Sequence, residues 1–200
     1  MELIIAMTIF LTLSSVMLAD YNGMNSRITL DTNAHQMAQW VRQTQISAMS
    51  VKHTQSDAST FPGYGLHFDR ATPGQFIFFA DLVPGVGLSP NKRYDPLIGM
   101  EKCGDAGVEC EQIVKLPKGN SIEKLCSEMT PFVLGPDCDT FSNANDFDII
   151  FTRPDPDAFI GGEYSTGNYA TSSRAVIYLK SVKGYRRLVE VWVTGQVSVQ

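Results

Sequence analysis

The chain has 200 residues and a mass of 22.1 kDa, which suits one domain of modest size and argues against a large multidomain enzyme. Hydrophobic residues make up 44% of it, enough for a core, so wholesale disorder is excluded. The net charge of -5 argues against a protein that binds nucleic acid over its whole surface.

The N-terminal segment is apolar. Residues 3–19 contain no charge, and Glu2 stands at their head. As a helix they would span about 26 Å, close to the lower limit for crossing a bilayer core. A secretory signal peptide is one interpretation, but no Lys or Arg precedes Arg27. An ordinary single-span anchor is a second, but it leaves the carboxylate of Glu2 unexplained. A third interpretation, given below, uses Glu2.

The next segment continues the helical pattern. Apolar residues recur at spacings of three and four from Leu30 to Val51, and no proline occurs before Pro62. We therefore predict one helix over about 2–53, with Gly23 as its weakest point. The predicted segments are an apolar half-helix at 1–23, an amphipathic half-helix at 24–55 and a β-rich head at 56–200.

The head has the pattern of short strands separated by Gly, Pro, Asn and Asp. Gly184 marks a hairpin turn between two of the strongest runs. The predicted fold class is α+β: a long N-terminal helix, membrane-spanning in its first half, packed on an antiparallel β-sheet or a two-sheet β head. The predicted strands lie at 64–68, 75–79, 112–116, 147–151, 175–179, 187–193 and 196–199.

The head contains four cysteines, Cys103, Cys110, Cys126 and Cys138. Their even number in a loop-rich segment indicates two disulfides. Sequential pairing would close two short loops, although the sequence leaves all three pairings open. A zinc site is disfavoured because neither spacing fits the usual two to four intervening residues, and free thiols are the remaining alternative.

Acidic residues gather in the second half of the head. Calcium favours several oxygen ligands from one flexible loop, which makes Asp137, Asp139, Asp146 and Asp148 a weak candidate calcium site. No ordered EF-hand spacing is present, so a solvated acidic loop is favoured, and no other metal or cofactor is predicted.

Basic residues gather near the C-terminus. No acidic residue occurs between Glu163 and Glu190, and a hairpin there could present one basic face beside aromatic residues. Such a face suits phosphate contacts with base stacking, although basic residues on an exposed strand also protect sheet edges. The candidate residues for DNA or an acidic surface are Arg174, Lys180, Lys183, Arg186 and Arg187.

Catalytic motifs are missing from the sequence. His35, His53 and His67 adjoin no nucleophile elbow, cysteine-protease signature or zinc-binding pair. The sequence also has no phosphate loop or dinucleotide fingerprint. We therefore predict that the protein is not an enzyme.

Residues 2–7, Glu-Leu-Ile-Ile-Ala-Met, resemble the start of type IV pilins and type II secretion pseudopilins after their leader. The family's leader, cleavage glycine and methylated phenylalanine do not occur in this sequence. The patterns at 64–68, 76–81 and 187–199 resemble minor-pilin heads related to pseudopilin H and to FimT-like pilins. The resemblance thins out between about residues 82 and 145.

The resemblance implies a structural minor subunit of a pilus or of a type II secretion-like filament involved in protein transport. The apolar half-helix would hold it in the inner membrane as a single-pass protein, with its head outside the cytoplasm, and would then pack in the core of a periplasmic or extracellular filament. Glu2 would pair with the N-terminal amine of a neighbouring subunit, so the implied partners are other pilin subunits and the membrane.

The resemblance also bears on ligands. Some pseudopilins bind calcium, and FimT-like pilins bind DNA through a basic C-terminal region, but this chain has no arginine after Gly195. The alternative function is a membrane-anchored extracellular module that binds DNA or an acidic surface through the basic hairpin.

Overall fold

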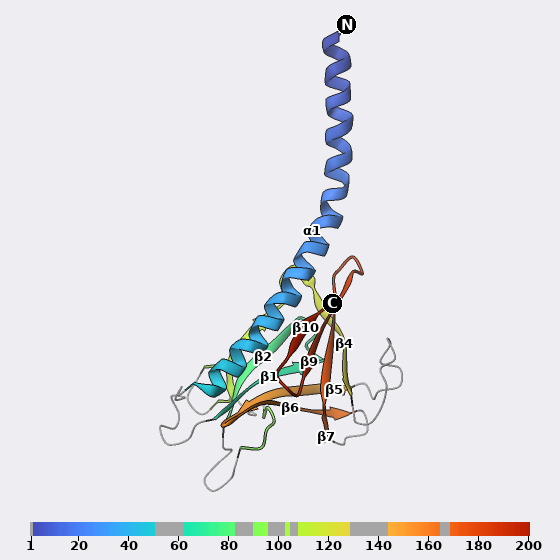
Figure 1. Cartoon of the computed structure of the whole chain (residues 1–200). Helices are drawn as coiled ribbons and strands as arrows, with labels where there is room; N and C mark the ends of the chain where they lie inside the picture. The colour runs from blue at the N-terminus through green and yellow to red at the C-terminus, as the bar shows by residue number, and fades with distance from the viewer. Residues whose placement is uncertain are drawn as a thin grey trace.

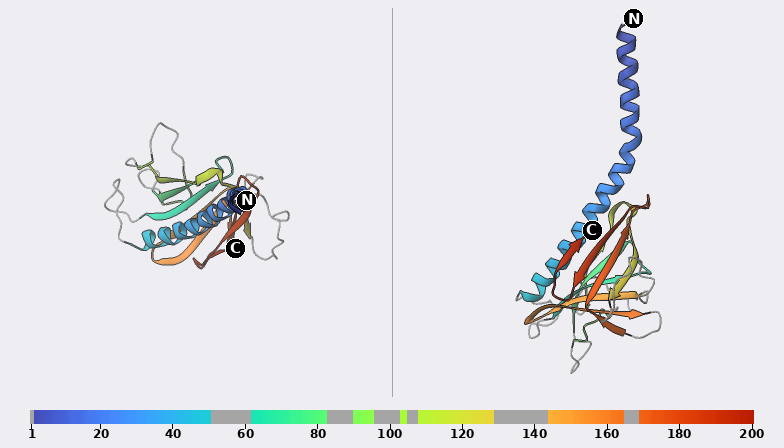
Figure 2. Two further views of the ribbon diagram at one scale, coloured as in Figure 1. Left: turned by 90° about the horizontal axis from the view of Figure 1, so that it is seen from above. Right: turned by 45° about the vertical axis from the view of Figure 1, so that its right-hand side comes forward.

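The computed structural model describes residues 2–50, 62–82, 90–95, 103–104, 108–128, 144–164 and 169–200 (Figure 1). Within these ranges it describes the backbone alone at 16–22, 127–128, 144, 163–164 and 169–170. The N-terminus lies at the far end of a projecting helix, and the C-terminus lies on the head beside that helix (Figure 2).

Helix α1 covers Glu2–Met49 and has two parts with different surroundings. Residues 2–15 project away from the head, whereas 23–49 cross the two sheets, and the helix bends between these parts (Figures 1 and 2). The packed part buries one stripe of side chains at helical spacing. Its buried apolar members are Leu30, Ala34, Met37, Ala38, Val41 and Ala48.

The C-terminal end of α1 is held by the head. The guanidinium of Arg153 donates two hydrogen bonds to the carbonyl of Met49, one of them from Nε at 3.0 Å. A cation at the last carbonyls of a helix satisfies groups that have no partner inside the helix. Gln45 adds a further tie, because its Nε2 donates to the carbonyl of Pro156 at 3.0 Å.

Within the described ranges, ten strands form two antiparallel sheets. The six-stranded sheet has the order β3-β2-β1-β5-β6-β7, and the four-stranded sheet has the order β10-β9-β8-β4. A short 3-10 helix at Pro117–Gly119 precedes β4. The strands are β1 Gly63–Asp69, β2 Gln75–Asp81, β3 Cys110–Lys115, β4 Ser121–Glu128, β5 Ala144–Thr152, β6 Asp155–Tyr164, β7 Tyr169–Ser172, β8 Arg174–Lys180, β9 Arg186–Trp192 and β10 Val197–Val199.

One hydrophobic core joins the packed part of α1 to both sheets. Tyr64 stacks on Phe78, and Trp40 of the helix meets Phe78 with ring centroids 5.8 Å apart. Val189 and Val191 of β9 are fully buried in the same cluster. The helix is thus a structural part of the head from about Leu30 onward.

The predicted fold class is wrong. The strands hold more residues than the helix, so the fold is mostly β, built from two antiparallel sheets rather than from a long helix packed on a sheet. Only residues 23–49 of the helix pack on the head, because the described side chains before them are turned to solvent.

The predicted single-pass location in the inner membrane is also wrong. In the part of the chain that the structure describes, no helix is both long enough and apolar enough to cross a membrane.

Candidate functional site

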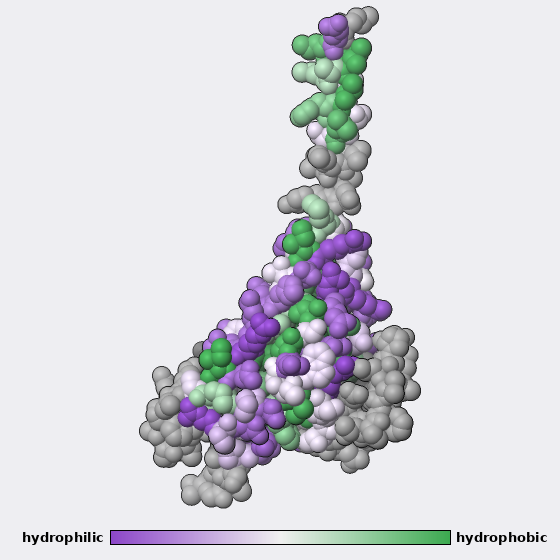
Figure 3. All heavy atoms as spheres, viewed as in Figure 1, coloured by the Kyte–Doolittle hydropathy of each residue, from purple (hydrophilic) through white to green (hydrophobic). Residues whose placement is uncertain are grey.

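The projecting part of α1 carries the largest set of exposed apolar side chains described in the molecule. Consecutive helical positions differ by about 100° in direction, so runs such as Leu3-Ile4-Ile5 and Ile9-Phe10-Leu11 cover all sides of the helix. We call residues 2–15 the projecting segment; Figure 3 shows apolar residues along the face of this segment that is in view. Its members exposed by 54% to 71% are Leu3, Ile4, Ile5, Met7, Ile9, Phe10, Leu11 and Leu13.

The polar groups within the projecting segment are largely satisfied from inside. The hydroxyl of Thr8 donates to the carbonyl of Ile5 at 2.8 Å, and that of Thr12 donates to the carbonyl of Ile9 at 2.9 Å. These bonds hide hydroxyls that would otherwise require a polar partner. Glu2 is the one charged side chain of the segment and lies in the first turn, where the helix dipole favours a carboxylate.

Apolar exposure continues along one side of the helix as it reaches the head. Met24 and Ile28, one turn apart, are each 57% exposed. Two residues later Leu30 enters the core. The apolar surface of the projecting segment therefore fades into a single stripe where the head begins.

The basic hairpin predicted from the sequence exists as β8 and β9, joined by a turn in which Gly184 has a φ of 85°. Its charges, however, are paired. Glu123 of β4 accepts from Arg186 at 2.7 Å and lies 3.3 Å from Lys180, and the hydrogen bond from Arg186 chiefly lowers the pKa of this carboxyl. Arg174 lies 3.9 Å from Glu190.

Arg187 is used to hold the helix. Its Nε donates to Asp31 of α1 at 2.9 Å, and Asp31 also lies 3.7 Å from His35. Nearby, the guanidinium of Arg27 stacks over the ring of Tyr185. Among the described residues, Lys183 at the exposed tip of the hairpin is thus the one candidate with no carboxylate within ion-pair distance. This pairing does not favour an anion-binding surface.

The weak calcium candidate is not assembled among the described residues. Asp137 and Asp139 lie outside them. Asp148 is buried, and its Oδ1 lies 2.8 Å from Nδ1 of His67, while Asp146 is half-buried on the same strand. No group of three or more His, Cys, Asp or Glu within the described ranges could hold a metal ion.

One cysteine pair is placed as sequential pairing predicts. Cys103 and Cys110 form a disulfide that closes a short loop leading into β3. Cys126 of β4 is also disulfide-bonded, and Cys138 lies outside the described residues. The described cysteines are therefore neither free thiols nor zinc ligands.

A cluster of buried carboxyls lies beside the six-stranded sheet and was not predicted from the sequence. Asp81, Glu109 and Asp148 are almost fully buried. Each accepts a backbone N–H from the segment 90–95: Lys92 to Asp81 at 3.0 Å, Asp95 to Glu109 at 2.7 Å and Tyr94 to Asp148 at 3.3 Å. The segment is thereby fastened to the sheet.

The buried carboxyls have unusual acidity. Burial raises the pKa of Glu109 to about 8 and that of Asp81 to about 6, and it also raises the pKa of Asp148. No local pattern marks these positions, because Asp81 ends β2 and Glu109 precedes β3, and the two residues are far apart in the chain. The cluster lacks a nucleophile and serves as an anchor for segment 90–95.

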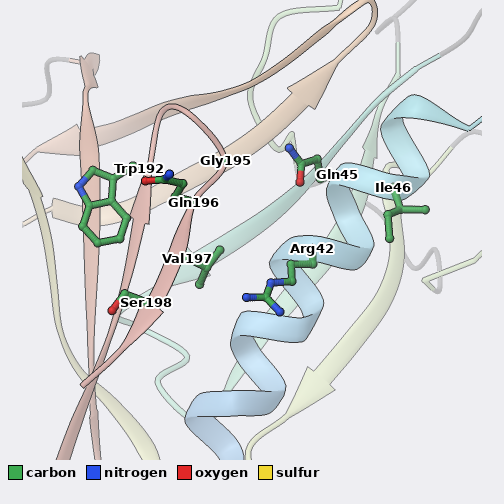
Figure 4. A pocket seen from close by; sticks show the side chains of 8 residues that line it. All are labelled: Arg42, Gln45, Ile46, Trp192, Gly195, Gln196, Val197 and Ser198. Carbon is green, nitrogen blue, oxygen red and sulfur yellow. The ribbon is translucent and has the colours of Figure 1, made fainter.

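A groove lies between α1 and the hairpin of β9 and β10, with a volume of about 620 Å³ (Figure 4). Arg42, Gln45 and Ile46 line the helix side. The strand side consists of Trp192, Gly195, Gln196, Val197 and Ser198. Ile46 is 61% exposed, which is unusual for a large apolar side chain beside a core.

Comparison of the chain with protein families, with curated proteins and with solved structures finds no match in any of the three. Function must therefore be argued from the projecting segment, the hairpin and the groove themselves.

Proposed function

We propose that the protein is a structural subunit that assembles with like chains through its projecting segment, in the manner of a minor pilin or pseudopilin in a helix-cored filament. The observation that carries the proposal is that an apolar helix surface, exposed on all sides, is held away from the head. A helix that is apolar all round is stable when other apolar groups surround it.

Neighbouring helices of the same kind fit this surface well. Burying a Leu, Ile or Phe side chain contributes about 1.5–3 kcal/mol, and the projecting segment offers eight large apolar side chains. Because they face all directions, one partner would cover only part of them, whereas a bundle of several copies would cover them all. The internally bonded hydroxyls of Thr8 and Thr12 leave little polar surface to oppose such packing.

In this proposal Glu2 fixes how neighbouring helices are aligned along their axes. A single carboxylate among apolar side chains is costly to bury unless a cation meets it. An N-terminal amine of a neighbouring subunit is a cation of the required kind, and such a pair would form at one stagger between helices only. The head would then be displayed outside the helical core, because α1 connects the two without an interruption.

The test is assembly of the full chain with substitutions in the projecting segment. Ile5→Asp and Phe10→Asp place charges on opposite sides of the segment, and we expect either one to reduce the assembled fraction at least tenfold in sedimentation of material from the producing cells. Glu2→Ala should leave the head folded and also block incorporation, because the register pair is lost.

The matched control is Val182→Asp, which makes the same change from an apolar side chain to a carboxylate at the tip of the hairpin, where Val182 is 77% exposed. Near-UV circular dichroism should be unchanged in all four proteins, because none of these side chains lies in the core. If Ile5→Asp and Phe10→Asp assemble as the wild type does, the proposal is wrong.

A further inference from the structure

The geometry points to β10 as a docking edge that takes an extended peptide segment of another protein, with a carboxylate of that peptide held by Arg42. The inference concerns the head and does not rest on the proposed assembly. Three observations carry it: free backbone groups on the edge of β10, the groove beside that edge, and the arginine on its far wall.

The backbone of β10 has one paired and one open side. Leu188 and Gln200 exchange hydrogen bonds in both directions, at 2.9 and 3.0 Å, and Trp192 N–H donates to the carbonyl of Gln196 at 2.9 Å. In an antiparallel pair the bonded residues alternate. The N–H and C=O groups of Val197 and Val199 therefore point away from β9.

Within the described ranges no strand pairs with the open side of β10. β10 is the edge of the four-stranded sheet and pairs with β9 alone. The opposite edge, β4, carries Glu123, Lys124 and Glu128 together with a register shift, features that discourage strand addition. The sequence of β10, Val-Ser-Val, has neither a charge nor a proline.

The groove gives an incoming strand its side-chain contacts. Val197 and Val199 pack against the core, so Ser198 faces the opposite side together with Trp192. An added strand would alternate in the same way, with one set of side chains meeting exposed Ile46 and the other set meeting the Trp192 side (Figure 4). This is the recognition mode in which main-chain bonds give affinity and flanking pockets give specificity.

Arg42 sets the charge of the preferred peptide. Among the residues lining the groove it is the only charged one. It is exposed, and in the described part of the chain its guanidinium forms no ion pair. A guanidinium binds a carboxylate through two parallel N–H bonds, so the favoured peptide carries Asp or Glu opposite α1.

The groove has the size of a peptide or small-ligand site. A second copy of this chain would have to bring its own β10, flanked by its own α1, into about 620 Å³. The occupant is therefore a short extended segment rather than another head.

The experiment uses the full chain in a nonionic detergent and a blocked synthetic octapeptide of alternating valine and threonine with one central aspartate. Titration calorimetry measures the affinity, and amide NMR shifts locate the site. We expect binding with amide shifts at Val197 and Val199. The same peptide N-methylated on the residues that face β10 should lose binding, whereas N-methylation on the alternate residues should not.

Variants sharpen the test. Arg42→Gln should weaken binding about tenfold, equal to 1.4 kcal/mol, while Lys183→Gln, which removes the same charge elsewhere, should have no effect. Replacing the peptide aspartate by asparagine should weaken binding to the wild type but not to Arg42→Gln. The inference is overturned by absence of binding at about 1 mM peptide, by indifference to the position of N-methylation, or by self-association of the chain through β10 in place of peptide binding.

Discussion

The two parts of α1 belong to one continuous helix, yet they have opposite surroundings. In the packed part, a stripe from Leu30 to Ala48 is buried and the remaining sides are mostly polar. In the projecting segment, apolar side chains lie on all sides and are exposed. Helix formation and burial are therefore separate matters: the packed part is stabilised by the head, whereas the projecting segment has an apolar surface that the described part of the chain does not cover.

The largest expected difference between the two parts of α1 is in the effect of a side-chain truncation on the stability of the head. Met37→Ala should reduce the free energy of unfolding of the head by about 2–5 kcal/mol, because Met37 is fully buried and its loss leaves a cavity. Leu11→Ala, a truncation of similar size in the projecting segment, should change that free energy by less than about 0.5 kcal/mol. Urea unfolding followed by near-UV circular dichroism measures both.

A similar loss of stability in the two variants would contradict the distinction between the parts. Assembly provides the converse measurement: the proposal expects Leu11→Ala to weaken self-association more than Met37→Ala does at a temperature where both heads are folded. The two substitutions together therefore separate the stability of the head from the cohesion of the assembly.

The sequence predicted these two parts unequally well. The apolar run at residues 3–19 predicted a helix but not the exposure of its side chains. An apolar surface that is covered by other molecules has the same composition as a core, so the sequence of one chain does not distinguish the two. The membrane interpretation rested on the same apolar run, and in the described part of the chain no helix is both long enough and apolar enough to cross a membrane. In the packed part, spacing at three and four predicted Leu30, Ala34, Met37 and Val41 correctly.

The strands were also predicted unequally well. Runs of alternating or aromatic residues, such as 64–68 and 75–79, were predicted and lie within β1 and β2. Strand β6 was missed because Pro156 and two glycines disguise it. The structure requires small residues there: a Cβ on Gly162 would lie 2.6 Å from the carbonyl oxygen of Asp146. Close backbone approach, not β propensity, selects this residue.

The candidate sites were predicted in part. The disulfide between Cys103 and Cys110 is one of the pairings that the sequence left open, and proximity in sequence favours its closure. The basic hairpin was found, but its neutralisation by Glu123 and Asp31 was not, because those carboxylates come from β4 and α1, far away in the chain. The buried carboxyls depend on the segment 90–95 that covers them, and such a tertiary contact leaves no local pattern.

The buried carboxyls should make the stability of the head depend on pH, without involving the projecting segment. A carboxyl whose pKa is raised by folding keeps its proton in the folded state and loses it on unfolding. The folded state is therefore favoured most below pH about 4.5, and stability falls as pH rises towards about 8, the pKa of Glu109. The slope is at most about 1.4 kcal/mol per pH unit for this proton.

Glu109→Gln should reduce this loss of stability with rising pH. The amide has one acceptor oxygen where the carboxyl uses two, at 3.2 Å from the N–H of Leu82 and 2.7 Å from that of Asp95, so the variant should be less stable than the wild type near pH 5. The deficit should shrink by pH 8. Denaturant unfolding at pH 5, 6, 7 and 8 measures it, with Glu111→Gln in the adjoining strand β3 as the control. Parallel curves for wild type and Glu109→Gln would contradict the assignment.

The smallest effect concerns the ion pair that fastens the helix to the hairpin. Arg187 and Asp31 are each nearly half exposed, so water screens their attraction. Arg187→Gln should reduce the free energy of unfolding by less than about 1 kcal/mol, and the loss should disappear in 1 M salt. A double-mutant cycle with Asp31→Asn isolates the pair, because removal of either partner should remove the same coupling.

The same two substitutions test whether the hairpin is an anion-binding surface. If Arg187 contacted DNA instead of holding α1, Arg187→Gln would weaken DNA binding. Asp31→Asn, which frees the arginine, would then strengthen it. We expect neither substitution to create or abolish retention on DNA at low salt, because three of the other four basic residues of the hairpin also lie against carboxylates.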